Sequence, residues 1–289
     1  MAQDTSSSNH DHGRATSSAP GSFWFDDGSV IITVAQERFK LHKSLVNRHS
    51  TLLPLLPASG IDDEHVPHVE IPSNLTNVKD FMALLGHIYH DAPLDREPLS
   101  SVSSILRVSS DKSLQFPTIH SLAKARFCRL LEPGPGVANF TTPDDLEEVL
   151  GLAVEHDISS VQKALYYNVA TTSHFEPGTP HPSLPPVVTA RCAALQDALI
   201  AHFTPILFTV ATAGHMACTD VFAETWMPDV IAPALANNGL CHPIETLREI
   251  QAVRWEDKGI CDECCQQKRA EWDEEVRVVW DKVDTWLSL

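Results

Sequence analysis

The hydrophobic pattern of the first third of the chain changes from alternation to helical spacing near residue 41. The apolar run Val30 to Val34 is followed by a polar turn over 35–38, after which Phe39 and Leu41 alternate with Lys40 and His42. This pattern predicts a β-hairpin. Leucines and Val46 then recur at helical spacing up to Leu56, broken by Arg48-His49-Ser50 and by two prolines. Two short helices packed on the hairpin are therefore expected.

A second strand-to-helix transition follows. Residues 69–71 form a short strand closed by Pro72, and residues 74–90 then place seven apolar side chains on one helical face, with Ser73 or Asn74 as the expected cap. Residues 100–131 read as two helices separated near Pro117. The mixture of strands and helices predicts an α+β fold for this part of the chain.

The second half of the chain has only helical patterns. Pro133-Gly134-Pro135-Gly136 interrupts any helix, and a helix is expected from Thr142-Pro143-Asp144-Asp145, followed by a partner helix over 158–170. A proline-rich linker separates these from four further predicted helices, at 187–213, 221–236, 243–253 and 263–287, the first of them kinked at Pro205. The prediction is an all-α C-terminal region.

Composition and charge exclude several classes of protein. The formal net charge of −17 and the absence of any run among the 21 Lys and Arg residues argue against direct nucleic-acid binding. Residues 1–22 are polar and predict a disordered tail without a secretory signal, and no stretch is apolar enough to predict a membrane span. The expected protein is soluble and intracellular, in the cytoplasm, the nucleus or both.

The hairpin and the helices after it carry a resemblance to a known family. Phe39-x-Leu41-His42-Lys43-Ser44-Leu45 resembles the BTB/POZ signature, in which a strand ending F-x-[VL]-H-[KR] leads into a helix, and the Ile88-Tyr89 pair resembles the end of that family's third helix. Residues 105–117 are similar to the helices that close the domain, and Phe23-Trp24-Phe25-Asp26-Asp27-Gly28 is similar to fungal members. Together with the composition and the breaks in the helical pattern, the resemblance divides the chain into five parts: a tail (1–22), a BTB/POZ domain (23–132), a helical pair (133–173), a linker (174–186) and an all-α region (187–289).

The resemblance also implies a function. BTB/POZ domains are protein-interaction modules, so a non-enzymatic scaffold or adaptor is expected, with protein partners that include a second copy of the chain as a homodimer. The expected interaction surface carries Phe23, Trp24, Phe25, Phe39, His42 and Arg48. The resemblance gives His42 the role of tying the hairpin to the next helix. Some members are substrate adaptors for cullin ubiquitin ligases, although Leu94-Asp95-Arg96-Glu97 places the glutamate one residue beyond the family's adaptor motif.

Signatures of enzymes are absent from the sequence, which contains no phosphate loop, dinucleotide turn, G-x-S-x-G or H-E-x-x-H motif. The sharpest chemical hypothesis is a structural zinc site. Cys261-x-x-Cys264 has the spacing at which two thiolates bind one tetrahedral ion, and His215-x-x-Cys218 supplies a second pair. Cys241, His242 or Cys265 is an alternative ligand.

Two other interpretations of these residues stay open. In one, Cys218 and Cys264 are small buried residues and His215 is a cation at a helix end, so the protein holds no cofactor. In the other, His215, Cys218, Cys261 and Cys264 form a zinc or thiol site of a regulatory protein. The tryptophans Trp255, Trp272, Trp280 and Trp286 are expected to form the core of the C-terminal helices.

Overall fold

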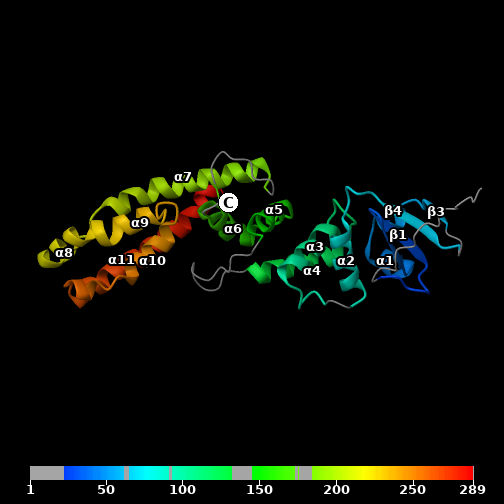
Figure 1. Ribbon diagram of the computed structural model, residues 1–289, viewed down its shortest axis with the longest axis horizontal. Coiled ribbons are helices and arrows are strands. Elements are labelled where there is room, and N and C mark those ends of the chain that lie inside the picture. The colour runs from blue at the N-terminus through cyan, green and yellow to red at the C-terminus, as the bar shows by residue number, and fades with distance from the viewer. Residues whose placement is uncertain are drawn as a thin grey trace, which may run out of the picture. The chain divides into compact units, whose positions relative to one another are not determined.

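The computed structural model of the chain describes residues 23–61, 65–90, 93–131, 145–172, 175 and 184–288. It divides into two compact units, the first ending at Ala123 and the second beginning at Lys124 (Figure 1). The division lies inside a helix and before the boundary predicted near Glu132. The predicted tail, the Pro-Gly break and most of the predicted proline-rich linker lie outside the described residues.

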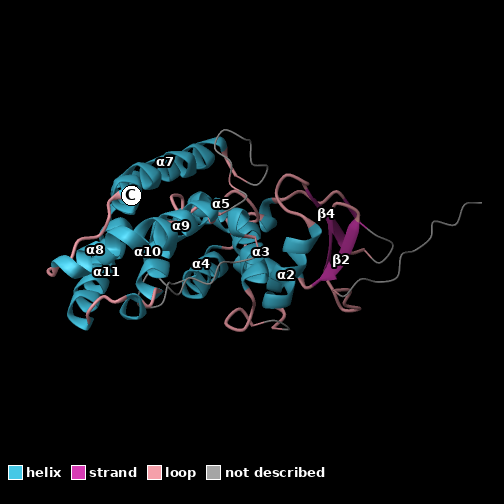
Figure 2. Ribbon diagram, turned by 60° about the vertical axis from the view of Figure 1, so that its left-hand side comes forward, coloured by secondary structure: helices cyan, strands magenta, loops and turns pink. Residues whose placement is uncertain are grey.

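Unit 1 contains a four-stranded sheet in the order β2-β1-β4-β3, beside the helices α2 and α3 (Figure 2). Strands β1 (Val30–Val34) and β2 (Glu37–Leu41) form the predicted antiparallel hairpin, with Ile32 opposite Phe39. The hairpin is tighter than predicted, since β2 already begins at Glu37. Strand β4 (Pro67–Ile71) runs parallel to β1 and antiparallel to β3 (Gly60–Ile61). This parallel pair brings two segments more than thirty residues apart into register and forms the centre of the sheet.

The helices of unit 1 follow the predicted order with some differences in their ends. After the hairpin come one α-helix, α1 (Lys43–His49), and a single 3-10 turn, η1 (Leu53–Leu55), where two short helices were predicted. Helix α2 (Val78–Ile88) is capped by Asn77, whose side chain accepts from the backbone amide of Asp80, and not by Ser73 or Asn74. Helices α3 (Leu99–Ser109) and α4 (Pro117–Leu131) are separated at Pro117, as predicted.

Unit 2 is built from helices in its described part. Helices α5 (Leu146–Glu155) and α6 (Ser159–Thr171) pack together, and α6 also packs on α7 (Pro186–Phe208). Helix α8 (Met216–Trp226) continues through a π-helical turn, η2 (Met227–Ile231), into α9 (Ala232–Ala236). Helix α10 (Pro243–Ala252) and the 3-10 turn η3 (Trp255–Lys258) lead to the long helix α11 (Asp262–Leu287), which packs against α6, α7 and α10.

Helix α7 ends at Phe208, earlier than the predicted residue 213, and two side chains explain the end. The indole Nε1 of Trp226 donates to the carbonyl of Leu207 at 2.9 Å, and the Thr209 hydroxyl donates to the carbonyl of Pro205 at 2.6 Å. These bonds take up carbonyls that the last turn of a helix leaves without amide partners. The helix therefore ends here, and residues 209–215 connect it to α8 without helical or strand structure.

Four aromatic side chains form the core at one end of unit 2. Trp255, which is fully buried, lies 5.0 Å from Phe222 and 6.0 Å from Trp272 between ring centroids, and Trp226 stacks on it at 6.2 Å. The prediction that the tryptophans pack in the core is confirmed for Trp255 and Trp272, whereas Trp280 and Trp286 are half-buried. No helix in the described part of the chain is both long enough and apolar enough to cross a membrane.

Candidate metal centre

The structure brings together the four residues proposed as metal ligands. His215 Nδ1 lies 3.3 Å from Cys261 Sγ, Cys218 Sγ lies 3.7 Å from Cys261 Sγ, and Cys264 Sγ lies 3.6 Å from His215 Nδ1. All four ligand atoms lie within 4.8 Å of one another. We call this group the Cys3His cluster.

The three closest distances match the edges of a tetrahedron around a zinc ion. Bond lengths of about 2.3 Å to sulfur and about 2.0 Å to nitrogen give sulfur–sulfur edges of about 3.8 Å and sulfur–nitrogen edges of about 3.5 Å. The sulfur–sulfur distance of 3.7 Å and the nitrogen–sulfur distances of 3.3 and 3.6 Å lie close to these edges. The side chains are therefore spaced so that one ion can reach all four.

The two ligand pairs occupy equivalent positions on two helices. His215 is the N-cap residue of α8, and Cys218 is the third residue within that helix. Cys261 and Cys264 hold the same two positions at the start of α11. A spacing of three residues from the N-cap places both side chains at the end of the helix, which explains why each pair meets the other. The N-termini of α8 and α11 lie at the same end of unit 2 (Figure 1).

The cluster rests on the aromatic core. Phe222, one turn after Cys218 on α8, packs edge-on against Trp255 and Trp272. The Trp255 indole donates to the carbonyl of Ile250 at 3.0 Å, which fixes the turn η3 on α10. Gly259 then has a φ of 100°, a conformation that favours glycine, and turns the chain toward Cys261. This packing holds the ends of α8 and α11 at the distance that the ligands require.

The Thr219 hydroxyl holds the segment that precedes the ligands His215 and Cys218. Thr219 Oγ1 accepts from the backbone amide of Ala213 at 2.9 Å and lies 3.3 Å from the carbonyl oxygen of His215. The same threonine therefore holds the chain before and after Gly214. This contact orients the His215 segment at the start of α8.

The electrostatic environment favours a thiolate in the cluster. The backbone amide of Cys264, followed by the His215 ring and the Cys264 thiol, lowers the pKa of Cys261 to about 7. Cys264 is buried, and burial raises the pKa of its thiol. Both thiols lie at the positive end of a helix dipole, which stabilises negative charge.

The alternative ligands lie outside the cluster. Cys265 is buried and directs its thiol to the carbonyl of Ile260 at 3.7 Å, and burial raises its pKa to about 11. Cys241 and His242 do not belong to the group of ligand atoms around His215. Among the described residues, the Cys3His cluster is the set whose geometry suits a metal ion.

The residues predicted for the interaction surface of unit 1 are found in different environments. Phe23 and Phe39 are buried in the core, so they are not accessible as contact residues, and this part of the prediction is corrected. Trp24 and Phe25 are half-buried, and Arg48 is exposed. Phe39 packs edge-on against Phe81 of α2, because the alternation of β2 directs it toward the helices.

His42 connects three segments of unit 1. Its Nδ1 lies 3.2 Å from the Tyr89 hydroxyl and its Nε2 lies 3.1 Å from Asp27, while Phe25 stacks on Tyr89 at 4.7 Å. The hydrogen bond to His42 lowers the pKa of Asp27, and burial raises the pKa of Tyr89. His42 thus joins the end of the hairpin to the segment before it and to the end of α2.

Comparisons with protein-family models, with curated proteins and with solved structures found no match to this chain.

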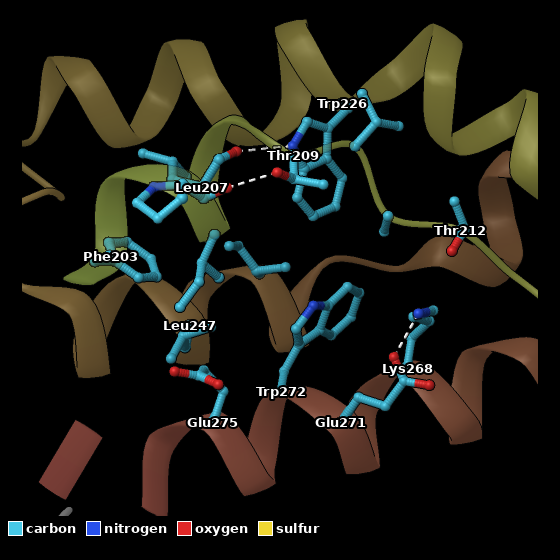
Figure 3. A pocket seen from close by; sticks show the side chains of 15 residues that line it. Phe203, Leu207, Thr209, Thr212, Trp226, Leu247, Lys268, Glu271, Trp272 and Glu275 are labelled. Carbon is cyan, nitrogen blue, oxygen red and sulfur yellow. Dashed lines mark hydrogen bonds and ion pairs between the residues drawn. The ribbon is translucent and has the colours of Figure 1, made fainter. Parts of the chain in front are cut away.

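A further feature of unit 2 was not predicted from the sequence. A cavity of about 420 Å³ lies between the end of α7, α8, α10 and α11, and Trp226 and Trp272 contribute to its wall (Figure 3). The π-helical turn that follows Trp226 contains Pro228, which lacks an amide hydrogen. Trp226 lies inside the helix predicted over 221–236, but sequence reasoning gave it no role, because the contacts that place it at the cavity are tertiary and leave no local pattern.

Proposed function

We propose that this chain is a non-enzymatic protein-interaction protein whose second unit is held together by a structural zinc ion. The observation that carries the zinc assignment is the Cys3His cluster with its tetrahedral edges of 3.3, 3.6 and 3.7 Å. Thiolate and imidazole ligands in tetrahedral geometry are the set that zinc prefers in proteins. Four protein ligands leave no coordination position for water or substrate, which is typical of structural and not of catalytic zinc.

The charge of such a site is partly balanced by its surroundings. Three thiolates and one neutral imidazole give a zinc complex with one net negative charge. The N-termini of α8 and α11 both point at the complex and each carries a partial positive charge. Zinc would link two helices whose ligand pairs are far apart in the sequence, so its main effect would be on the stability and rigidity of this end of unit 2.

The metal content of the purified full-length chain tests this assignment. Elemental analysis of the chain is expected to give one zinc per chain. Cys264→Ser is expected to lose the zinc, while Cys265→Ala, a change at the next residue of the same helix, is expected to keep it. A wild-type chain purified without chelators that takes up no zinc on reconstitution contradicts the assignment, as does loss of zinc from both variants equally.

The proposed interaction role rests on unit 1, which we propose is a BTB/POZ-like domain. The resembling motif is supported by its local setting, since β2 ends at Leu41, His42 follows and α1 begins at Lys43. Tyr89 directly follows the last residue of α2 and contacts His42, so the two parts of the resemblance meet in space. Trp24, which lies beside the edge strand β2, and the exposed Arg48 would belong to the pairing surface.

Light scattering on the full-length chain tests self-association. A homodimer is expected, and Trp24→Ser is expected to shift it toward monomer, whereas Leu55→Ser, which changes an exposed side chain outside the proposed surface, is expected to leave it dimeric. A monomeric wild-type chain contradicts pairing through this surface. If that monomer co-purifies with a cullin scaffold, the adaptor alternative replaces the homodimeric scaffold.

A further inference from the structure

The cavity between the end of α7, α8, α10 and α11 has apolar walls from four helices. Phe203, Leu207, Trp226, Leu247, Ile250 and Trp272 line it. Figure 3 shows the Trp272 indole standing on α11 and facing the space below Trp226. Its volume of about 420 Å³ lies in the range of cavities that bind ligands, which is about 300 to 1,000 Å³, and it accommodates a large aromatic side chain.

One edge of the cavity is acidic. Glu271 and Glu275 line it from successive turns of α11, together with Lys268. Lys268 and Gln267 both bind the Glu271 carboxylate, so the charge of Glu271 is largely balanced. Glu275 accepts a hydrogen bond from His202 on Oε1 at 2.8 Å, and its Oε2 has no hydrogen-bond partner among the described residues. Two carboxylates and one ammonium leave this edge with net negative charge, which favours a cationic ligand.

Another edge consists of backbone with free hydrogen-bonding groups. The chain leaves α7 at Phe208 and runs from Thr209 to Thr212 along the cavity (Figure 3). Thr209 has extended backbone angles. In the described part of the chain, the backbone amides of Val210, Ala211 and Thr212 have no hydrogen-bond partner, while the next amide, that of Ala213, is bound by Thr219. Backbone amides without an internal partner at the rim of a cavity are suited to hydrogen bonding with the backbone of a peptide.

We propose that this cavity is the docking site for a short extended peptide of a partner protein, with one aromatic side chain in the cavity and a Lys or Arg beside Glu275. The inference rests on the proposed protein-interaction role, and it specifies an aromatic and a basic residue in the segment of the partner that binds. The free backbone over 210–212 favours a peptide as the ligand, and the formal net charge of −17 favours a basic one. Side chains at positions i and i+2 of an extended peptide point the same way, which sets the spacing of the aromatic and basic residues.

Fluorescence anisotropy with labelled peptides tests the inference on the full-length, zinc-loaded chain. The probe is Ser-Lys-Thr-Phe-Thr-Lys-Ser, and its controls replace the Phe by Ala or both Lys by Glu. The probe is expected to bind at least about tenfold more tightly than either control, because only it fills the apolar cavity and meets the acidic edge. Absence of binding up to millimolar concentrations, or equal binding of the three peptides, overturns the proposal.

Two variants locate the bound peptide. Glu275→Gln keeps an acceptor for His202 but removes the charge, and is expected to weaken binding of the probe by about 3- to 10-fold. Glu274→Gln, a change at the adjacent exposed residue outside the cavity lining, is expected to leave the affinity within about twofold. Ala211→Trp adds bulk from the loop and is expected to weaken binding at least about tenfold. Equal effects of Glu275→Gln and Glu274→Gln, or unchanged affinity in Ala211→Trp, overturn the location.

The zinc content and the solution mass of the same preparations separate this inference from the proposed function. A dimeric chain with one zinc that binds none of the peptides refutes the docking site alone. A chain without zinc or without self-association refutes the corresponding part of the proposed function, whatever its affinity for peptides.

Discussion

The thiol sulfurs of Cys218 and Cys261 lie 3.7 Å apart although 43 positions separate them in the sequence. Cys218 is the third residue of α8, and Cys261 is the N-cap residue of α11. One ion can bind both sulfurs only when the fold brings these distant segments together, so the free energy of metal binding adds to that of folding. Metal binding and the folding of unit 2 are therefore expected to be coupled.

Removal of the metal is expected to destabilise unit 2. A chelator such as phenanthroline should reduce its free energy of unfolding by at least about 3 kcal/mol, because the ligand atoms then lose their common partner and the thiolates repel one another. Thermal unfolding followed by circular dichroism measures this effect. Cys241→Ser changes a cysteine outside the cluster and should respond to the chelator as the wild-type chain does. The same unfolding temperature with and without chelator, for a chain shown to contain zinc, would argue against coupling.

Oxidation of the metal-free chain is expected to join Cys218 to Cys261. Diamide takes two electrons and two protons from the two thiols and is reduced to the hydrazine, while a sulfur–sulfur bond forms. A movement from 3.7 Å to a bond of about 2.05 Å requires only a small shift of the side chains. Peptide mapping by mass spectrometry should find this pair before any pair with Cys265, whose thiol faces the Ile260 carbonyl. Bound zinc should slow the reaction, and preferential bonding of Cys265 would contradict the geometry.

The ion pair between Asp80 and Arg107 is expected to stabilise unit 1 in a pH-dependent manner. Arg107 Nε lies 2.9 Å from the buried Asp80 carboxylate, and Arg107 Nη2 lies 3.0 Å from its other oxygen. Burial alone would raise the pKa of Asp80, but the hydrogen bonds of Arg107, Ser104 and Asn77 outweigh it and hold the pKa below its ordinary value of 3.8. Because the folded pKa is lowered, the contribution is present above pH 3.8 and is lost as the pH falls through the folded value.

Asp80→Asn is therefore expected to lower the free energy of unfolding of unit 1 by about 1 to 3 kcal/mol at pH 7. This range lies between the losses expected for exposed and for buried ion pairs. Asp273→Asn, which removes an exposed pair with Arg277, should cost less than about 0.5 kcal/mol. Urea unfolding at pH 7 and near pH 3 measures both variants. A difference between Asp80→Asn and wild type that grows toward acid pH would contradict the role of the ionised carboxylate.

Trp255 is expected to be essential for the structure around the cluster. It is fully buried and contacts Phe222, Trp226 and Trp272. Trp255→Ala should therefore lower the free energy of unfolding by about 3 to 5 kcal/mol, and it should also weaken zinc binding. Trp286→Ala changes a half-buried tryptophan near the other end of α11 and should leave the zinc content unchanged. Denaturant unfolding and elemental analysis check the pair. Full zinc content and wild-type stability in Trp255→Ala would show that the aromatic core does not position the ligands.

The metal ligands could be predicted from the sequence because each pair is local. The spacing of three residues in His215-x-x-Cys218 and Cys261-x-x-Cys264 survives any packing of the helices, so the pattern alone identified both halves of the cluster. That the halves meet could not be derived, because it depends on the aromatic core and on the turn at Gly259. The helix boundaries were needed to see that each pair consists of the N-cap residue and the third residue of a helix.

Other features depended on tertiary contacts that no local pattern encodes. The early end of α7 follows from the bond between Trp226 and the Leu207 carbonyl, and the cavity exists because the chain leaves the helix there. The apolar spacing of β1 and β2 predicted the hairpin, but it did not reveal that β4 would pair parallel to β1. Phe39 was expected on a surface, and its burial follows from its contact with Phe81 of α2.

X-ray absorption at the zinc edge of the purified full-length chain tests the central claim most directly. A Cys3His cluster predicts three sulfur neighbours at about 2.3 Å and one nitrogen at about 2.0 Å around each ion. In His215→Ala the nitrogen neighbour should disappear or be replaced by a water oxygen while the three sulfurs remain. A zinc shell made only of nitrogen and oxygen, or one whose sulfur neighbours persist unchanged in Cys261→Ser, would contradict the account.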